Sequence, residues 1–420
     1  MQKKALWPWV LVSSLVSSAC KTPGAEPVRD SDPPRAGRDA ARRAPIAASH
    51  DAALRAPVNA VPFDAAALLG DGGASACKLL YGPAEQPFHG MAALGIADGK
   101  VTLVTNDSGR PRSYVVPVPP LGAIVAAPRP GPPDAPKDAT TWPPCEVAGK
   151  MIYCAGPSGQ VSRHGPSGER AIARALPRTR IAASSIGRER GVVAYLVDRT
   201  TSEGPTIQAW AALDDAEPVR LSEDGSGATQ IVLVPVGERV VAIYLDSRSA
   251  MTPIHARELS VSADGKLVLG PDAVIAIGGP AERGVTLAAG STRGQVFALV
   301  PLPEQVTIFG MASVRVPLPP TDDLPLVWSR YAGGLDPAPL AATRGEGAVR
   351  VARVVPSGSA ASAPRVLEVG KLDPEGRFVS QGVISSAPVT GVAVAEDPAR
   401  TLWVLHGDPS RTWLERRACP

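Results

Sequence analysis

Acidic, basic and imidazole side chains gather where short apolar strands of this sequence end. They follow runs such as VTLVTN, GVVAYLVD, VAIYLD and LWVLHG. Together they could bind a polar partner or supply a general acid and base; the alternative is that they form turn hydrogen bonds and surface ion pairs, worth about 0–1 kcal/mol each. The candidate binding residues are Asn106, Asp107, Arg110, Arg112, Asp198, Arg199, Asp246, Arg248, His406, Asp408 and Arg411.

No motif assigns a reaction to these residues. The sequence lacks the phosphate-binding Gly-x-x-x-x-Gly-Lys-Ser/Thr loop, the Gly-x-Ser-x-Gly elbow, His-Glu-x-x-His and an EF-hand loop. Its five histidines lie far apart in sequence and form no local set of metal ligands. We therefore leave the catalytic residues unassigned and expect no metal and no cofactor.

The charge pattern argues against a nucleic-acid partner. The chain has 43 Lys and Arg against 40 Asp and Glu, for a formal net charge of +3. Both signs are interspersed along the sequence, so no region carries the single-sign field that attracts a polyanion. A mixed, solvated surface is expected instead.

The strands that precede the candidate residues recur at regular intervals. Related strands begin near residues 101, 151, 192, 240, 296, 349 and 402. A repeat of about 50 residues built from short strands is typical of a β-propeller. The 45 Pro and 41 Gly fit a chain rich in strands and turns. The sequence thus predicts an all-β, seven-bladed propeller, with six or eight blades left open because the copy around 296–319 is the weakest.

Propeller topology would bring the candidate residues together. Each blade has four antiparallel strands, a to d from the channel outward, so every turn between strands b and c lies on the same face of the ring. The candidate residues occupy these turns in the first, third, fourth and seventh copies. We call this the b-to-c face, and we expect it to be the binding surface.

Four cysteines suggest how the ring closes. Cys145 and Cys154 flank a hairpin centred on Gly149-Lys150, which places them opposite each other at a non-hydrogen-bonded position. The remaining pair is Cys77 and Cys419. The last copy lacks a strand d, and the N-terminal strand 77–82 can supply it, so that a Cys77–Cys419 disulfide would lock the ring. Free buried thiols and a metal site are less favoured alternatives.

The N-terminus indicates export. Lys3 and Lys4 precede an apolar stretch over 5–16, which is too short to span a bilayer, and then Ser17-Ser18-Ala19-Cys20. This resembles a bacterial lipoprotein signal, which implies removal of 1–19 and lipidation of Cys20. It departs from that pattern at Ser17, where such signals usually carry Leu, so an ordinary cleaved secretory signal is the alternative.

The segment 21–76 is rich in Ala, Pro and Arg and predicts a disordered tether between the anchor and the head. Lys21 stands where an Asp retains some lipoproteins at the inner membrane. The resemblance therefore implies a lipid anchor in the cell envelope, at the outer membrane rather than the inner one.

Residues 77–420 resemble bacterial exported propellers, with a WD40-like period but without the Gly-His and Trp-Asp signatures of that family. This resemblance implies an architecture and carries no catalytic residue across. Our first hypothesis is a lipid-anchored binding or scaffold protein with a monomeric head, which presents the b-to-c face to an envelope protein or glycan. The alternative is a propeller hydrolase or lyase acting on an envelope or extracellular polymer, and a third is a purely structural envelope protein.

Overall fold

The computed structural model divides the chain into two units, residues 1–61 and 62–420. It describes 76–420 except for 87, 89, 98–99, 108–109, 117–143, 188–189, 202–203, 215, 224–225, 248–251, 279–286, 293, 306–307, 323, 333–338, 345–346, 357–364, 386–388 and 409. The predicted signal, the lipidation site Cys20 and nearly all of the predicted tether lie outside the described residues.

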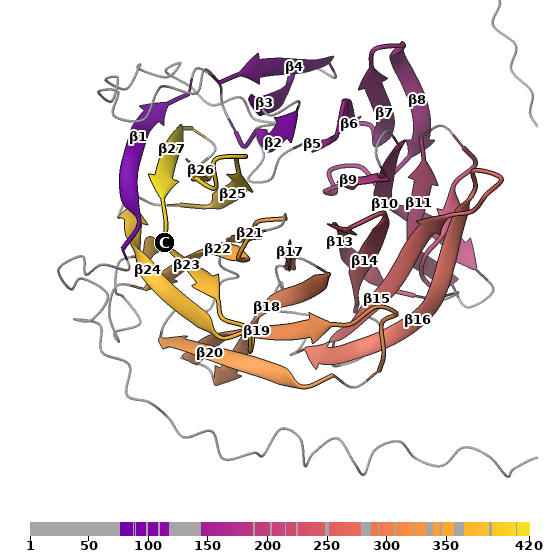
Figure 1. The fold of residues 1–420 in the computed structure, drawn as a ribbon. Helices are drawn as coiled ribbons and strands as arrows, with labels where there is room; N and C mark the ends of the chain where they lie inside the picture. Colours follow the sequence, from indigo (N-terminus) through magenta and orange to yellow (C-terminus); the bar gives the residue numbers. More distant parts are fainter. Residues whose placement is uncertain are drawn as a thin grey trace, which may run out of the picture. The chain divides into compact units, whose positions relative to one another are not determined.

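The described strands form seven antiparallel sheets, numbered here as blades one to seven (Figure 1). The strands of each blade are given from the innermost outward. Blade one has β2 (Ala93–Ala97), β3 (Lys100–Asp107) and β4 (Arg110–Val115), and blade two has β5 (Cys145–Ala148), β6 (Met151–Ala155), β7 (Gln160–Gly165) and β8 (Gly168–Arg174). Blade three has β9 (Ala182–Ile186), β10 (Arg190–Thr201), β11 (Gly204–Leu213) and β12 (Val219–Arg220), and blade four has β13 (Ala228–Val236), β14 (Arg239–Asp246), β15 (Thr252–Val261) and β16 (Leu267–Gly278). Blade five has β17 (Ala288–Thr292), β18 (Gln295–Gln305), β19 (Ile308–Val316) and β20 (Leu326–Ala332), and blade six has β21 (Leu340–Ala342), β22 (Arg350–Pro356), β23 (Arg365–Leu372) and β24 (Phe378–Ser385). Blade seven has β25 (Gly391–Glu396), β26 (Leu402–Gly407), β27 (Thr412–Ala418) and β1 (Lys78–Glu85).

The seven innermost strands close a ring. Each contacts the innermost strand of the next blade, from β2 through β5, β9, β13, β17 and β21 to β25, and β25 contacts β2 again. This confirms the seven-bladed, all-β propeller. Within the described residues there is no helix, so none that could cross a membrane.

The second strand of each blade explains why the repeat is visible in the sequence. In β14, RVVAIYLD, every residue after Arg239 is buried, because the strand is covered by a neighbouring blade on each face of its own sheet. Such strands read as continuous apolar runs rather than as an alternation of apolar and polar residues. These runs recur with the period from which the blades were predicted.

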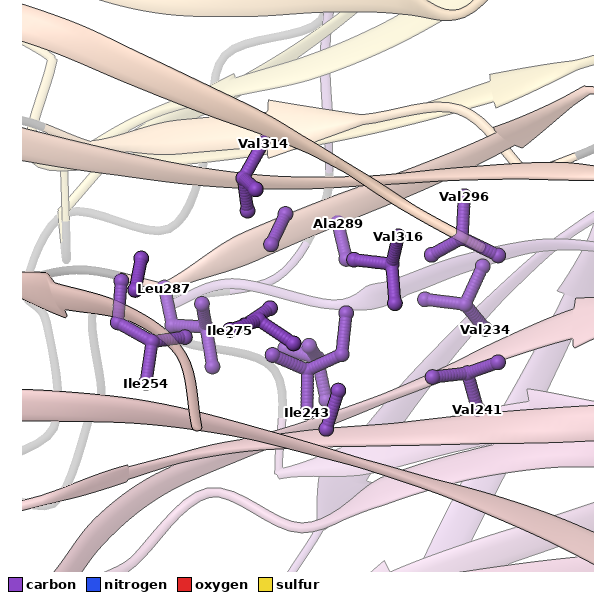
Figure 2. Packing of buried hydrophobic residues seen from close by; sticks show 14 of the residues in the cluster. Val234, Val241, Ile243, Ile254, Ile275, Leu287, Ala289, Val296, Val314 and Val316 are labelled. Carbon is purple, nitrogen blue, oxygen red and sulfur yellow. The ribbon is translucent and has the colours of Figure 1, made fainter. Parts of the chain in front are cut away.

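Apolar side chains from adjacent blades form the core between the sheets. Figure 2 shows the largest cluster, in which Val241 and Ile243 of blade four pack with Val296 and Val314 of blade five. Blade five corresponds to the weakest copy in the sequence, yet it forms four strands. Burying such β-branched side chains stabilises the ring by about 1.5–3 kcal/mol each.

Blade seven is assembled from both ends of the repeat region. β1 pairs antiparallel with β27, with Lys78 opposite Ala418 and Glu85 opposite Trp413 (Figure 1). Cys77 and Cys419 form a disulfide with their Cα atoms 4.2 Å apart. The N-terminal strand therefore supplies the outermost strand of this blade, as predicted.

Blade six reinforces this closure from the side. Arg350 donates hydrogen bonds to the main-chain oxygens of Cys419 and Pro420, at 2.7 and 2.8 Å, and to the Gln381 side chain at 2.7 Å. Gln381 also donates to the Pro420 oxygen at 2.8 Å. These charge-assisted bonds hold the disulfide region against the neighbouring blade.

The second disulfide lies within blade two. Cys145 is directly opposite Cys154 in the β5–β6 ladder, and Ala148 is opposite Met151. Gly149 adopts a positive φ of 59°, which the tight turn between these strands requires. Both disulfides and the hairpin register are thus confirmed, and two disulfides indicate an oxidising compartment.

Candidate functional site

A cavity of about 270 Å³ runs along the axis of the propeller. All seven innermost strands line it, mostly with small side chains such as Ala93, Ala183, Ala289 and Ala342. These strands begin at the b-to-c face, because strands alternate in direction within each blade and strand b ends where strand a begins. One end of the cavity therefore lies at the centre of the predicted binding face.

Three charged residues meet inside the cavity. Arg180, two residues before β9, places its Nη2 atom 3.3 Å from Oε1 of Glu146, the second residue of β5. Arg344, which follows β21, donates from Nη1 to the main-chain oxygen of Ala183 at 3.3 Å. We call Glu146, Arg180 and Arg344 the axial charge cluster.

Arg344 reaches across the propeller axis. Its backbone belongs to blade six, where it forms a parallel bridge to Ser291 of blade five. Its hydrogen-bond acceptor, Ala183, belongs to blade three, which lies three blades away around the ring. The side chain thus spans the cavity to join opposite sides of the propeller.

The electrostatic setting of Arg344 is unusual for a guanidinium. Burial among the inner strands lowers the pKa of Arg344, the carboxylate of Glu146 raises it, and the charge of Arg180 lowers it again. The net effect is a pKa below the ordinary value of 12.5. The cavity therefore holds a half-buried cation, with a second cation, Arg180, and the carboxylate of Glu146 as its charged neighbours among the described residues.

A second carboxylate lines the cavity toward its other end. Glu396 is the last residue of β25, and its Oε1 lies 3.6 Å from Nη1 of Arg400. Glu146, in contrast, is near the beginning of its strand. The two carboxylates therefore lie toward opposite mouths of the cavity.

Several of the sequence-predicted residues do lie at b-to-c turns. Asp198 and Arg199 are exposed near the tip of the β10–β11 hairpin, and the Arg199 guanidinium lies 5.4 Å from the ring centroid of Trp210. Arg112 and Arg411 are also exposed. Asn106, Asp107 and Arg110 belong to the β3–β4 hairpin, in which Asp107 is opposite Arg110. Arg248 lies outside the described residues.

Three other predicted residues serve the fold instead of facing solvent freely. Asp246 is 3% exposed, and its Oδ1 accepts a hydrogen bond from the Gly227 amide at 2.9 Å. Asp408 accepts from the amides of Ser410 and Arg411, at 2.7 and 2.9 Å, and so caps its own turn. For Asp408 the structure shows the turn hydrogen bonds that the sequence offered as the alternative to a binding role, whereas Asp246 bonds the backbone that leads into the neighbouring strand β13.

His406 is likewise enclosed. It is 2% exposed, its Nε2 lies 2.9 Å from Oε1 of Glu415, and Oε2 of Glu415 lies 2.7 Å from Arg417. Burial raises the pKa of Glu415, but the hydrogen bond to His406 and the charge of Arg417 outweigh it and lower the pKa overall. His406 is thus hydrogen-bonded to the buried Glu415–Arg417 ion pair within blade seven, so no surface partner touches it in this arrangement.

The sequence reasoning missed the axial charge cluster. Glu146 and Arg180 carried a local signal, since each is a charged residue at or just before the start of a short strand that precedes one of the recurring apolar strands. Arg344 offered no such signal, because its contact is with a blade more than 160 residues away.

Within the described residues, no three or more His, Cys, Asp or Glu side chains come together to hold a metal ion.

No protein family and no curated protein matches this chain. Solved structures with a similar arrangement include a mutant sialidase of Trypanosoma rangeli, with a TM-score of 0.37 and 12% identity over 79% of this chain and 54% of that one. Another is an α-L-arabinofuranosidase from Lactobacillus brevis, with a TM-score of 0.32 and 10% identity over 54% and 88%. A third is the six-bladed lectin of Aleuria aurantia, with a TM-score of 0.33 and 11% identity over 63% and 88%. None of these scores carries an activity over to this protein.

Proposed function

We propose that this protein is a lipid-anchored binding protein of the bacterial cell envelope, which presents its b-to-c face to a protein or glycan partner. The observation that carries the proposal is the axial charge cluster, whose Arg180 and Glu146 lie toward that face, together with the exposed β10–β11 hairpin tip that holds Asp198 and Arg199 on the same face. A rigid ring of seven sheets positions these groups, and loops on such scaffolds are where proteins usually bind.

The chemistry of the cluster favours binding over catalysis. Arginine remains protonated in proteins, so Arg180 and Arg344 can orient and neutralise an anion but cannot shuttle protons. The cluster has one carboxylate, Glu146, and it is paired with Arg180. A glycosidase-type mechanism needs two carboxyl groups across one bond, whereas Glu396 lies toward the opposite mouth of the cavity.

A photo-crosslinking residue in place of Asp198 is expected to trap a partner in intact cells that export the full chain. Position 198 is exposed on the b-to-c face. The matched control is position 238, where Glu238 is exposed in the β13–β14 turn on the opposite face. Specific adducts, detected by a mobility shift and mass spectrometry, should form from 198 and not from 238. Equal adducts from both positions, or adducts from neither, would contradict the proposed face.

Cys20→Ala is expected to release the protein from membranes. The signal that precedes Cys20 resembles a lipoprotein signal, and acyl chains attached to one residue are the only membrane anchor proposed for this chain. The unsubstituted protein should incorporate labelled palmitate and sediment with membranes, while the variant should do neither. The matched control is Ser18→Ala, which keeps the cysteine. Cleavage of the unsubstituted chain without lipid incorporation would show an ordinary secretory signal instead.

A further inference from the structure

The axial charge cluster has more positive than negative charge. It contains two guanidinium groups, Arg180 and Arg344, and one carboxylate, Glu146. A buried cation without a matching anion is costly, so such groups are normally paired. Among the described residues of the cluster the imbalance is one positive charge, which a single monoanion would remove.

The cluster also has an unused hydrogen-bond donor. Nε of Arg180 is buried and has no hydrogen-bond partner among the described residues. Buried donors of this kind are uncommon in folded proteins, and each one calls for an explanation such as an ordered water or a bound ligand. Arg344 has five N–H donors, of which Nη1 donates to Ala183.

We propose that the axial cavity binds a small carboxylate, held between the guanidinium groups of Arg180 and Arg344. Planar guanidinium forks match a carboxylate with paired hydrogen bonds. A carboxylate carries the single negative charge that balances the cluster, whereas a phosphate at neutral pH carries more and would repel Glu146. The cavity, of about 270 Å³, fits one small molecule or one end group rather than a polymer chain.

The ligand can enter from the b-to-c face. Arg180 lies just before β9, where the innermost strands begin, and its side chain is 38% exposed. Glu146, in contrast, is 13% exposed, so the cluster extends from the mouth into the interior. This inference rests on the proposed function and names the chemistry of what that face recognises at its centre.

Calorimetric titration of the purified full chain tests the proposal with a matched pair of sugars. Glucuronate and glucose share a ring and differ by one carboxylate, so glucuronate should bind at least roughly tenfold more tightly. Acetate should compete with glucuronate, and inorganic phosphate should compete less well than acetate. Equal binding of the two sugars, or tighter binding of phosphate than of either carboxylate, would overturn the proposal.

Variants separate a binding role from a structural one. Arg344→Gln should weaken glucuronate binding roughly tenfold or more, while Glu146→Gln should strengthen it several-fold, because it removes the competing carboxylate. A merely destabilised fold cannot produce that increase. Arg239→Gln is the control, because Arg239 pairs with Glu258 at 3.0 Å outside the cavity and its loss should leave binding unchanged. If Glu146→Gln and Arg344→Gln both bind as the unsubstituted protein does, the site assignment is wrong.

The two proposals can fail separately. Adducts from position 198 without any glucuronate binding would leave the binding face standing and remove the carboxylate site. Glucuronate binding that depends on Arg344, without adducts from 198, would keep the site and remove the macromolecular partner.

Discussion

Replacing both Cys77 and Cys419 with alanine is expected to lower the free energy of unfolding by about 4 kcal/mol. The disulfide closes a loop with a sequence separation of 342 residues. On the chain-entropy account such a long loop is worth roughly 5–6 kcal/mol at 25 °C, and measured values commonly fall below that account. Urea unfolding of the unsubstituted and substituted full chains measures the difference.

The Cys145–Cys154 disulfide provides the matched control. Its sequence separation is 9 residues, for which the same account gives only about 2.5–3 kcal/mol. Hydrogen exchange should also differ, because loss of Cys77–Cys419 frees the β1–β27 pair, whereas loss of the other bridge affects β5 and β6. An equal or larger effect from the Cys145/Cys154 double variant would show that the long bridge does not hold the ring closed.

Asp397→Asn is expected to cost about 3 kcal/mol or more. Asp397 is 4% exposed, and its Oδ2 accepts hydrogen bonds from Thr401 at 2.5 Å, Trp403 at 3.0 Å and Arg416 at 3.0 Å. Arg416 is itself 3% exposed, so an amide in place of the carboxylate leaves a buried cation poorly compensated. Removing one partner of a buried ion pair typically costs about 3–5 kcal/mol. Thermal and urea unfolding measure the loss.

The same residue gives a pH test. Burial raises the pKa of Asp397, but the hydrogen bonds from Thr401 and Trp403 and the charge of Arg416 outweigh it and bring the pKa below 3.8. The stability that this carboxylate contributes is therefore present above about pH 4 and is lost as the pH falls through its folded value. Asp397→Asn should lack this part of the acid sensitivity. Asp264→Asn, at an exposed turn, should change neither stability nor its pH dependence by a comparable amount.

Much of the fold follows from local patterns in the sequence. The apolar runs of strand b recur because each is covered on both sides, so β10, β14 and β26 mark their blades directly. Hairpin chemistry at Gly149 sets the register of Cys145 and Cys154, and the absence of a strand after β27 identifies β1 as its partner. These features depend on nearest neighbours or on covalent chemistry, which a sequence displays.

The candidate site follows from the sequence only in part. The antiparallel alternation of strands places Asp198 and Arg199 on one face, as expected. Whether a polar side chain at a strand end points outward or inward depends on its hydrogen-bond partners. Asp246 is buried with a hydrogen bond from Gly227, and His406 is buried with a hydrogen bond to Glu415. Arg344 meets Ala183 only because seven sheets close a circle. No local pattern encodes such a contact.

The pairing of β1 with β27 also constrains how the molecule is made. β1 is synthesised more than 300 residues before the strand that it must join, so it has no partner within its own blade until β27 has been made. The circle is therefore completed in a single late event, and it can be sealed by oxidation only afterwards. A circular permutant that begins at β25 would place all of blade seven in one continuous stretch, so this blade should form without waiting for the far end of the chain.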